Sequence, residues 1–88
     1  MSAQELAEMT SQMETLIRTS IDIAETLEIL ADQTENNMLR LALVEIKDKV
    51  QKGESLSSAM KEHPKIFNNL YVSLVEVGQE TGRLDDIL

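Results

Sequence analysis

The chain has no cysteine and no tryptophan, and its only aromatic residues are Phe67 and Tyr71. The absence of cysteine excludes disulfide bonds, thiolate metal ligands and thiol catalysis, and it fits a reducing compartment. Because aromatic side chains are so scarce, the core has to be built from Leu, Ile, Val, Ala and Met. This composition favours helices.

Long apolar runs and basic charge are also lacking. No run approaches the roughly 18 to 20 apolar residues that span a bilayer, and no charged-then-apolar leader precedes a cleavage site, so we expect a soluble chain. Lys and Arg number 8 against 16 Asp and Glu, which gives a net charge of −8. Nucleic acid is therefore not an expected partner, since phosphate binding depends on clustered Lys and Arg.

The charge is distributed unevenly along the chain. Acidic residues dominate the first 35 positions, where Arg18 is the only basic residue, whereas most of the basic residues lie between Arg40 and Lys65. Acidic and basic elements of this kind can attract each other within or between protomers, although a charged helix face is most often simply solvated.

Apolar residues recur at three- and four-residue steps and predict an all-α domain, and no strand pattern competes. The 88 residues are expected to form one domain. The predicted helices cover about 3–18, from Asp22 (in a capping box with Glu25) to Gln33, from the Asn36 cap to Lys52, a short stretch after Ser55, and from the Asn68 cap to Gly82. Gly53 is expected to be left-handed, and His63-Pro64 to stop the short helix.

A sixth helix is expected to begin with the final "RLDDIL" and to be cut short by the chain end. The residues expected to face inward, in chain order, are Leu6, Met9, Met13, Leu16, Ile17, Ile23, Leu27, Leu30, Met38, Leu39, Leu41, Ala42, Leu43, Ile46, Val50, Leu56, Ala59, Met60, Leu70, Leu74 and Val77.

Ser55 lies between Glu54 and Leu56, which admits two interpretations. A serine at a helix start can carry a phosphopantetheine arm, as in an acyl carrier protein, or it can act as an ordinary N-cap. The helix after a carrier serine is long and acidic, whereas this one spans about two turns, contains Lys61 and meets Pro64. The sequence therefore favours the N-cap, with the carrier as an alternative.

No other constellation of residues indicates chemistry. His63 is the only histidine, so a metal site with paired histidines cannot form. Asp85 and Asp86 with Glu80 could attract a divalent cation, but such clusters are usually solvated. No nucleophile, base and orienting group can be assembled, and we predict no catalytic, cofactor-binding or metal-binding residue and no enzymatic activity.

The order of features from Gly53 onward is more specific than any one of them. The segment "GESLSSAMKEHPKIFNNLYVSLVEVGQETGRLDDIL" resembles the cytoplasmic domain of the type II secretion system F protein and its type IV pilus counterpart, the inner-membrane platform protein. The resemblance covers nearly the whole chain and rests on Gly53, Ser55, Leu56, Ser57, His63, Pro64, Phe67, Leu70, Tyr71, Val72, Gly78, Thr81, Gly82 and Leu84.

The sequence departs from the family pattern at three places. Ser20 and Asp22 stand where the family often has Gly and Pro, and Asn68-Asn69 replaces a common Pro-Pro. Gln79 replaces a frequent Glu, which puts in doubt any role that depends on a carboxylate at this position.

The resemblance implies an antiparallel six-helix bundle, and it implies that this chain is one of two such domains of a longer protein with transmembrane helices, more like the first copy. The implied function is a scaffold on the cytoplasmic face of the bacterial inner membrane, which couples an assembly ATPase to pilin extraction. The implied partners are that ATPase, other platform components and a second copy in a homodimer. A free-standing cytosolic helical adaptor is the alternative, and the sequence does not distinguish pilus assembly from secretion.

Two further expectations concern the C-terminal part of the chain. Gly78 within the fifth helix suggests a close helix–helix approach, and a weak, fraying helix end is the alternative. A truncated sixth helix, with Leu84, Ile87 and Leu88 toward the bundle, would leave an apolar groove open, which favours a homodimer.

Overall fold

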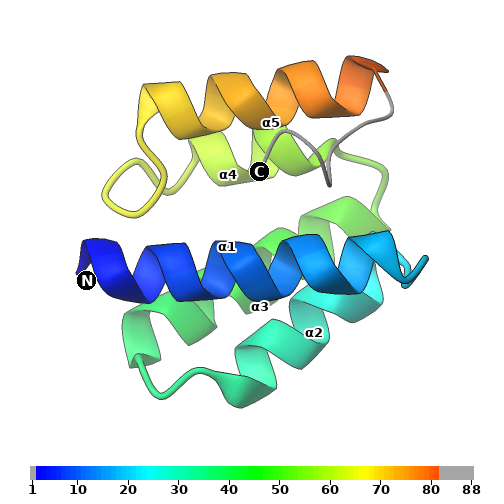
Figure 1. Ribbon diagram of the computed structural model, residues 1–88. Coiled ribbons are helices and arrows are strands. Elements are labelled where there is room, and N and C mark those ends of the chain that lie inside the picture. Colours follow the sequence, from blue (N-terminus) through cyan, green and yellow to red (C-terminus); the bar gives the residue numbers. More distant parts are fainter. Residues whose placement is uncertain (1, 82–88) are drawn as a thin grey trace.

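The computed structural model describes residues 2–81, and within that range the chain is entirely helical apart from its turns (Figure 1). The helices are α1 (Ala3–Arg18), α2 (Ile23–Gln33), α3 (Asn37–Gln51), α4 (Leu56–Lys61) and α5 (Asn69–Thr81). The predicted all-α class is confirmed. The expected sixth helix lies outside the described residues, as do Gly82 and Leu84.

The helix starts follow the predicted caps. The Asn36 side chain accepts a hydrogen bond from the Leu39 amide at 3.0 Å, and the Asn68 side chain accepts one from the Tyr71 amide at 2.8 Å. The Asp22 carboxylate accepts from the Glu25 amide at 3.3 Å, which confirms that half of the expected capping box. A cap satisfies backbone amides that have no partner inside the helix, so it fixes the residue at which the helix begins.

A complete capping box, which the sequence analysis did not propose, forms at the start of α1. The Ser2 hydroxyl accepts from the Glu5 amide at 3.1 Å, and the Glu5 carboxylate accepts from the Ser2 amide at 3.1 Å. Two otherwise unpaired amides are thereby satisfied at once.

The turns after α1 and α3 have the same hydrogen-bond pattern but differ in one residue. After α3, Gly53 has φ of 103°, its amide donates to Val50, and the Glu54 amide donates to Lys49. This is the Schellman arrangement, and the left-handed Gly53 was correctly predicted. After α1 the corresponding left-handed residue is Ser20, with φ of 69°. A residue with a side chain therefore occupies a backbone conformation that favours glycine.

The helices form two layers, with α4 and α5 above α1, α2 and α3 (Figure 1). One continuous core joins the layers, and it consists of aliphatic side chains with Phe67 as its largest ring. The Phe67 and Tyr71 rings lie 5.1 Å apart in a tilted arrangement. Most of the expected inward residues of α1 to α4 are buried in this core or packed against it.

The inward face predicted for α5 is wrong. Leu70, Leu74 and Val77 are 69%, 41% and 46% exposed, whereas the row of Val72, Val75 and Gly78 is buried. The apolar residues of α5 are distributed over most of its circumference, so the three- and four-residue spacing permits either row to face the core. The smaller row faces inward, and small residues allow a closer approach between helices.

The inward stripe of α3 was predicted too wide. Met38 is 45% exposed and Leu41 is 66% exposed, while Leu39, Ala42, Leu43 and Ile46 are buried. The neighbours of α3 are α2 on one side and α4 on the other, and they leave its outer surface uncovered.

Candidate interaction surface

Ser55 is the N-cap of α4. Its hydroxyl oxygen accepts a hydrogen bond from the Ser58 amide at 3.1 Å. The helix that follows has six residues and ends before His63 and Pro64. The predicted cap is thus confirmed, and the long helix on which carrier-protein partners dock is not formed after this serine.

Gln79 joins α5 to the start of α4. Its side-chain oxygen accepts a hydrogen bond from the Ser57 amide at 2.9 Å. This amide is among the first of α4 and has no partner inside the helix. The family motif position that often carries a glutamate therefore holds a hydrogen-bond acceptor for a neighbouring helix. This contact was not predicted, because the two residues are 22 positions apart in the sequence.

Tyr71 connects α5 to α1. Its hydroxyl lies 2.7 Å from that of Thr10, and the Thr10 hydroxyl is also 2.8 Å from the Leu6 carbonyl. A threonine hydroxyl has one proton, which goes to the carbonyl, so the Tyr71 hydroxyl is the donor to Thr10. Burial raises the pKa of the Tyr71 phenol. The tyrosine therefore stays protonated and serves as a packed hydrogen-bond donor.

The remaining motif residues divide into buried and peripheral positions. Phe67 is in the core and Gly78 is buried in α5, whereas Pro64 is exposed. Thr81 is the last residue of α5, and Gly82 and Leu84 lie outside the described residues. The motif residues that the structure describes are thus spread through the fold and do not converge on one reactive centre.

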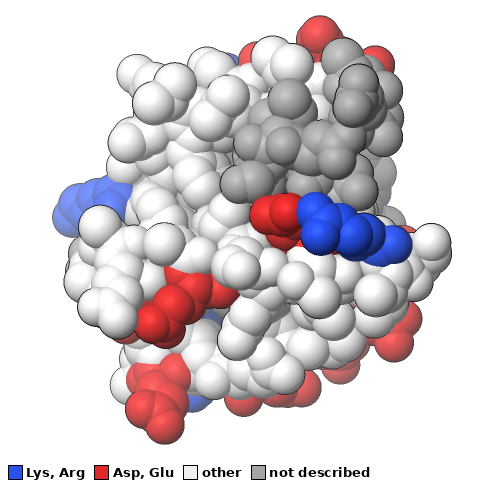
Figure 2. All heavy atoms as spheres, viewed as in Figure 1, with Lys and Arg blue, Asp and Glu red and all other residues white. Residues whose placement is uncertain are grey.

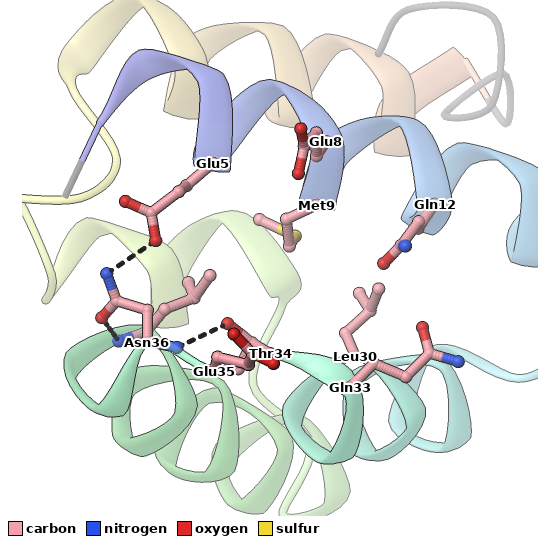
Figure 3. A pocket seen from close by; sticks show the side chains of 10 residues that line it. Glu5, Glu8, Met9, Gln12, Leu30, Gln33, Thr34, Glu35 and Asn36 are labelled. Atoms are coloured by element: carbon pink, nitrogen blue, oxygen red, sulfur yellow. Dashed lines mark hydrogen bonds between the residues drawn. The ribbon is translucent and has the colours of Figure 1, made fainter.

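A polar pocket of about 320 Å³ lies between the start of α1 and the turn from α2 to α3 (Figure 3). The Asn36 amide nitrogen donates to the Glu5 carboxylate across it at 3.1 Å. This contact and, to a greater extent, the Ser2 amide lower the pKa of the Glu5 carboxyl. The pocket has acidic and amide side chains but no nucleophile with an adjacent base, so it offers no catalytic arrangement.

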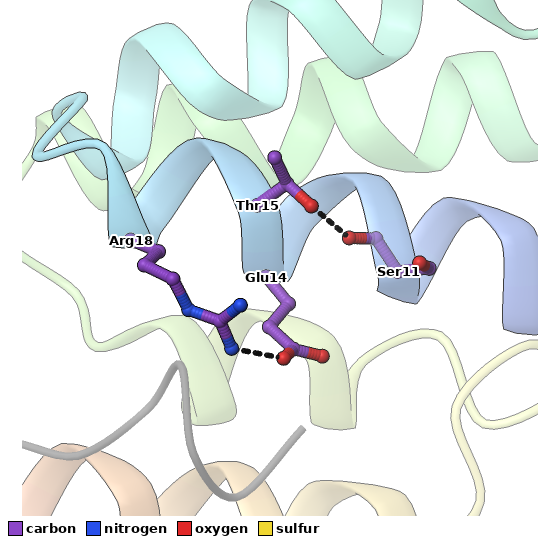
Figure 4. Close-up of polar contacts among 4 residues, drawn as sticks. All are labelled: Ser11, Glu14, Thr15 and Arg18. Atoms are coloured by element: carbon purple, nitrogen blue, oxygen red, sulfur yellow. Dashed lines mark hydrogen bonds and ion pairs between the residues drawn. The ribbon is translucent and has the colours of Figure 1, made fainter.

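Acidic side chains are prominent on the surface formed by α1 and α2 (Figure 2). On α1 the one basic residue, Arg18, forms an ion pair with Glu14 one turn earlier (Figure 4). On another side of the same helix, the Thr15 hydroxyl donates a hydrogen bond to the Ser11 carbonyl. In the part of the chain that the structure describes, no three metal-ligating side chains gather to hold an ion. Nor is any described helix long and apolar enough to cross a membrane.

Exposed large apolar side chains gather on two helices. One row is Leu70, Leu74 and Val77 of α5, and the other is Met38, Leu41 and Val44 of α3. The α3 row borders a groove of about 400 Å³, which we call the α3 groove. The groove is lined by Met38, Leu41, Ala42, Glu45, Glu62, His63, Pro64, Lys65 and Ile66. Exposed apolar surface of this kind marks binding sites for other molecules.

These features place the protein in the class of small all-helical domains with exposed apolar rows and no reactive centre among residues 2–81. The chain belongs to the family of type II secretion system protein F, whose family model matches residues 9–88. The resemblance seen in the sequence is confirmed.

Relatives from both pilus and secretion systems are similar to the chain. The type IV pilus assembly protein PilC of Myxococcus xanthus is 42% identical over 79 residues, which are 90% of this chain and 19% of the relative. The type II secretion system protein F of Vibrio cholerae is 34% identical over 87 residues, which are 99% of this chain and 21% of the relative. The chain thus spans about a fifth of the length of these relatives.

Proposed function

We propose that the chain is a scaffold domain of a longer inner-membrane platform protein in type IV pilus assembly or type II secretion. The observation that carries the proposal is the family match over residues 9–88. The two exposed apolar rows support binding as the task of the domain.

In this role the domain lies on the cytoplasmic face of the inner membrane and couples the assembly ATPase to the extraction of pilin or pseudopilin subunits. Its partners are the ATPase, other platform components and a second copy of the domain. Residues after Thr81 add a sixth helix to the five described ones, and the domain is the first of two copies in the full protein. These assignments rest on the family resemblance.

The test is an in-frame deletion, in the parent gene, of the segment that encodes residues 2–81. We expect loss of surface pili or of a secreted reporter enzyme, with the remaining protein still present in the membrane fraction. Restoring the segment should restore assembly. Normal pili and normal secretion in the deletion strain would contradict the proposal, and the process that fails would tell pilus assembly from secretion.

A further inference from the structure

The outer surface of α3 carries an apolar row that no other described element covers. Met38, Leu41 and Val44 follow one another in three-residue steps and are 45%, 66% and 49% exposed. Single exposed apolar residues are ordinary, but a continuous row beside a groove is not. Pro64 and Ile66 extend the apolar lining on the side of the α3 groove. The row therefore has the form of one side of a helix-binding groove.

An acidic row of α2 runs along the opposite side of this surface. The row consists of Glu25, Glu28 and Asp32, which are exposed and recur at three- and four-residue steps. Two contacts place it beside the apolar row: the Lys47 ammonium is 3.7 Å from the Glu28 carboxylate, and the Arg40 guanidinium donates to the Thr34 carbonyl at 2.6 Å. Val44 lies one helical turn from both Arg40 and Lys47, so it faces the same edge of α2.

The negative charge of this surface is only partly neutralised within the described residues. Glu28 has Lys47, but Glu25 and Asp32 have no ion pair there. The basic side chains of α3 are already engaged: Arg40 with backbone carbonyls of α2, Lys49 with Glu62 and Lys52 with Asp48.

The charges near the α3 groove are more mixed. The Glu45 carboxylate lies 3.3 Å from Nε2 of the His63 imidazole. Lys65 on the far rim is the one basic residue of the groove lining besides His63. The unbalanced negative charge is thus concentrated on the α2 side of the apolar row.

We infer that this surface binds a cationic amphipathic helix of a partner protein. Apolar residues of such a helix, spaced by three and four positions, would lie on Met38, Leu41 and Val44, and its Lys or Arg residues on one flank would reach Glu25 and Asp32. A second copy of this chain fits less well, because its net charge is −8 and α1 and α2 would bring further carboxylates to the acidic row. The inference deepens the proposed scaffold function, since it gives the chemistry of one partner.

Binding of a synthetic helix of about 18 leucines and lysines, long enough to form several turns, tests the inference. Its fluorescence anisotropy is measured with the 88-residue chain. Two control peptides are used: one with the same composition in scrambled order and one with glutamate in place of lysine. We expect binding of the amphipathic cationic peptide alone, and weaker binding as the salt concentration rises. Equal binding of the scrambled peptide would overturn the inference, because the apolar row would then contribute nothing.

Variants of the protein locate the binding surface. Leu41→Ser should weaken binding about tenfold, since a leucine side chain would no longer be buried, whereas Leu70→Ser on the α5 row should have no effect. The pair Glu25→Gln with Asp32→Asn should weaken binding and flatten its salt dependence.

A matched pair of charge changes on α5, Glu76→Gln with Glu80→Gln, should leave binding unchanged. Equal effects of the two pairs would show attraction to net charge only and would refute the surface. Self-association of the chain that Leu41→Ser abolishes would also refute it, because the occupant would then be a second copy. Neither result would alter the outcome of the gene-deletion test, so the two proposals can fail separately.

Discussion

Replacing Ser20 by glycine should stabilise the domain. Ser20 has φ of 69°, and a left-handed conformation costs a residue with a side chain about 1 to 2 kcal/mol. No described residue makes a hydrogen bond to the Ser20 hydroxyl, so its removal sacrifices no contact within residues 2–81. Glycine also increases the conformational entropy of the unfolded chain, which lowers the free energy of unfolding by about 0.4 to 1 kcal/mol. The difference lies between about 0 and 1.6 kcal/mol, and its mid-range value predicts that Ser20→Gly raises the free energy of unfolding by about 0.8 kcal/mol.

Urea denaturation followed by circular dichroism measures this change. For a small domain the denaturant slope is about 1 to 3 kcal/mol per molar urea, so the midpoint should rise by about 0.2 to 1 M. The matched control is Ser73→Gly, which changes an exposed serine inside α5 and should lower the midpoint through helix propensity. A midpoint that falls for both variants would refute the argument, because Ser20 would then not be strained.

Three other outcomes follow from the structure, and a fourth, the homodimer, follows from the family resemblance. Ser55→Ala should lower the free energy of unfolding by about 0.5 to 2 kcal/mol through loss of the cap, and Ser55 should gain no mass when the chain is incubated with a phosphopantetheinyl transferase and coenzyme A. Gln79→Met should cost about 1 to 3 kcal/mol by leaving the Ser57 amide unpaired, whereas Gln79→Glu, which keeps an acceptor, should not; equal losses would exclude the hydrogen bond as the cause. Gly78→Leu should lower the free energy of unfolding by about 1 to 3 kcal/mol through overpacking, and a raised urea midpoint would contradict a close helix contact. Sedimentation should show a homodimer that high salt weakens only modestly; a monomer at high concentration and high salt would reject it.

The helix boundaries could be predicted because they depend on residues close in sequence. Asn36, Ser55 and Asn68 each bond an amide three positions later, and Gly53 ends α3 through its own backbone. The choice of buried row on α5 could not be predicted in this way. Both rows are apolar, and the selection depends on how closely α4 can approach, which is a property of the assembled bundle.

The candidate binding surface could not be predicted from the sequence either. Met38 and Leu41 extend the apolar stripe of α3, and an amphipathic pattern alone assigns them to the core. Their exposure depends on the number and position of neighbouring helices. The contact between Ser57 and Gln79 has the same origin, since only the packing of α4 on α5 brings them together.

The hydrogen bond between Ser57 and Gln79 ties the folding of α4 to that of α5. A helix of six residues is too short to persist alone in water, because the first turn is costly to nucleate. Its start is held by Ser55 and by Gln79, and it packs on both α5 and α3, so undocking of α5 removes a large part of what keeps α4 helical. The two helices should therefore open as one cooperative unit, with similar protection of their slowest amides against hydrogen exchange. A force that lifts α5 from the bundle would therefore favour unwinding of α4. The segment between Gly53 and Asn68, part of which lines the α3 groove, could then extend, so a force applied at one end of the domain would lengthen the chain at the groove.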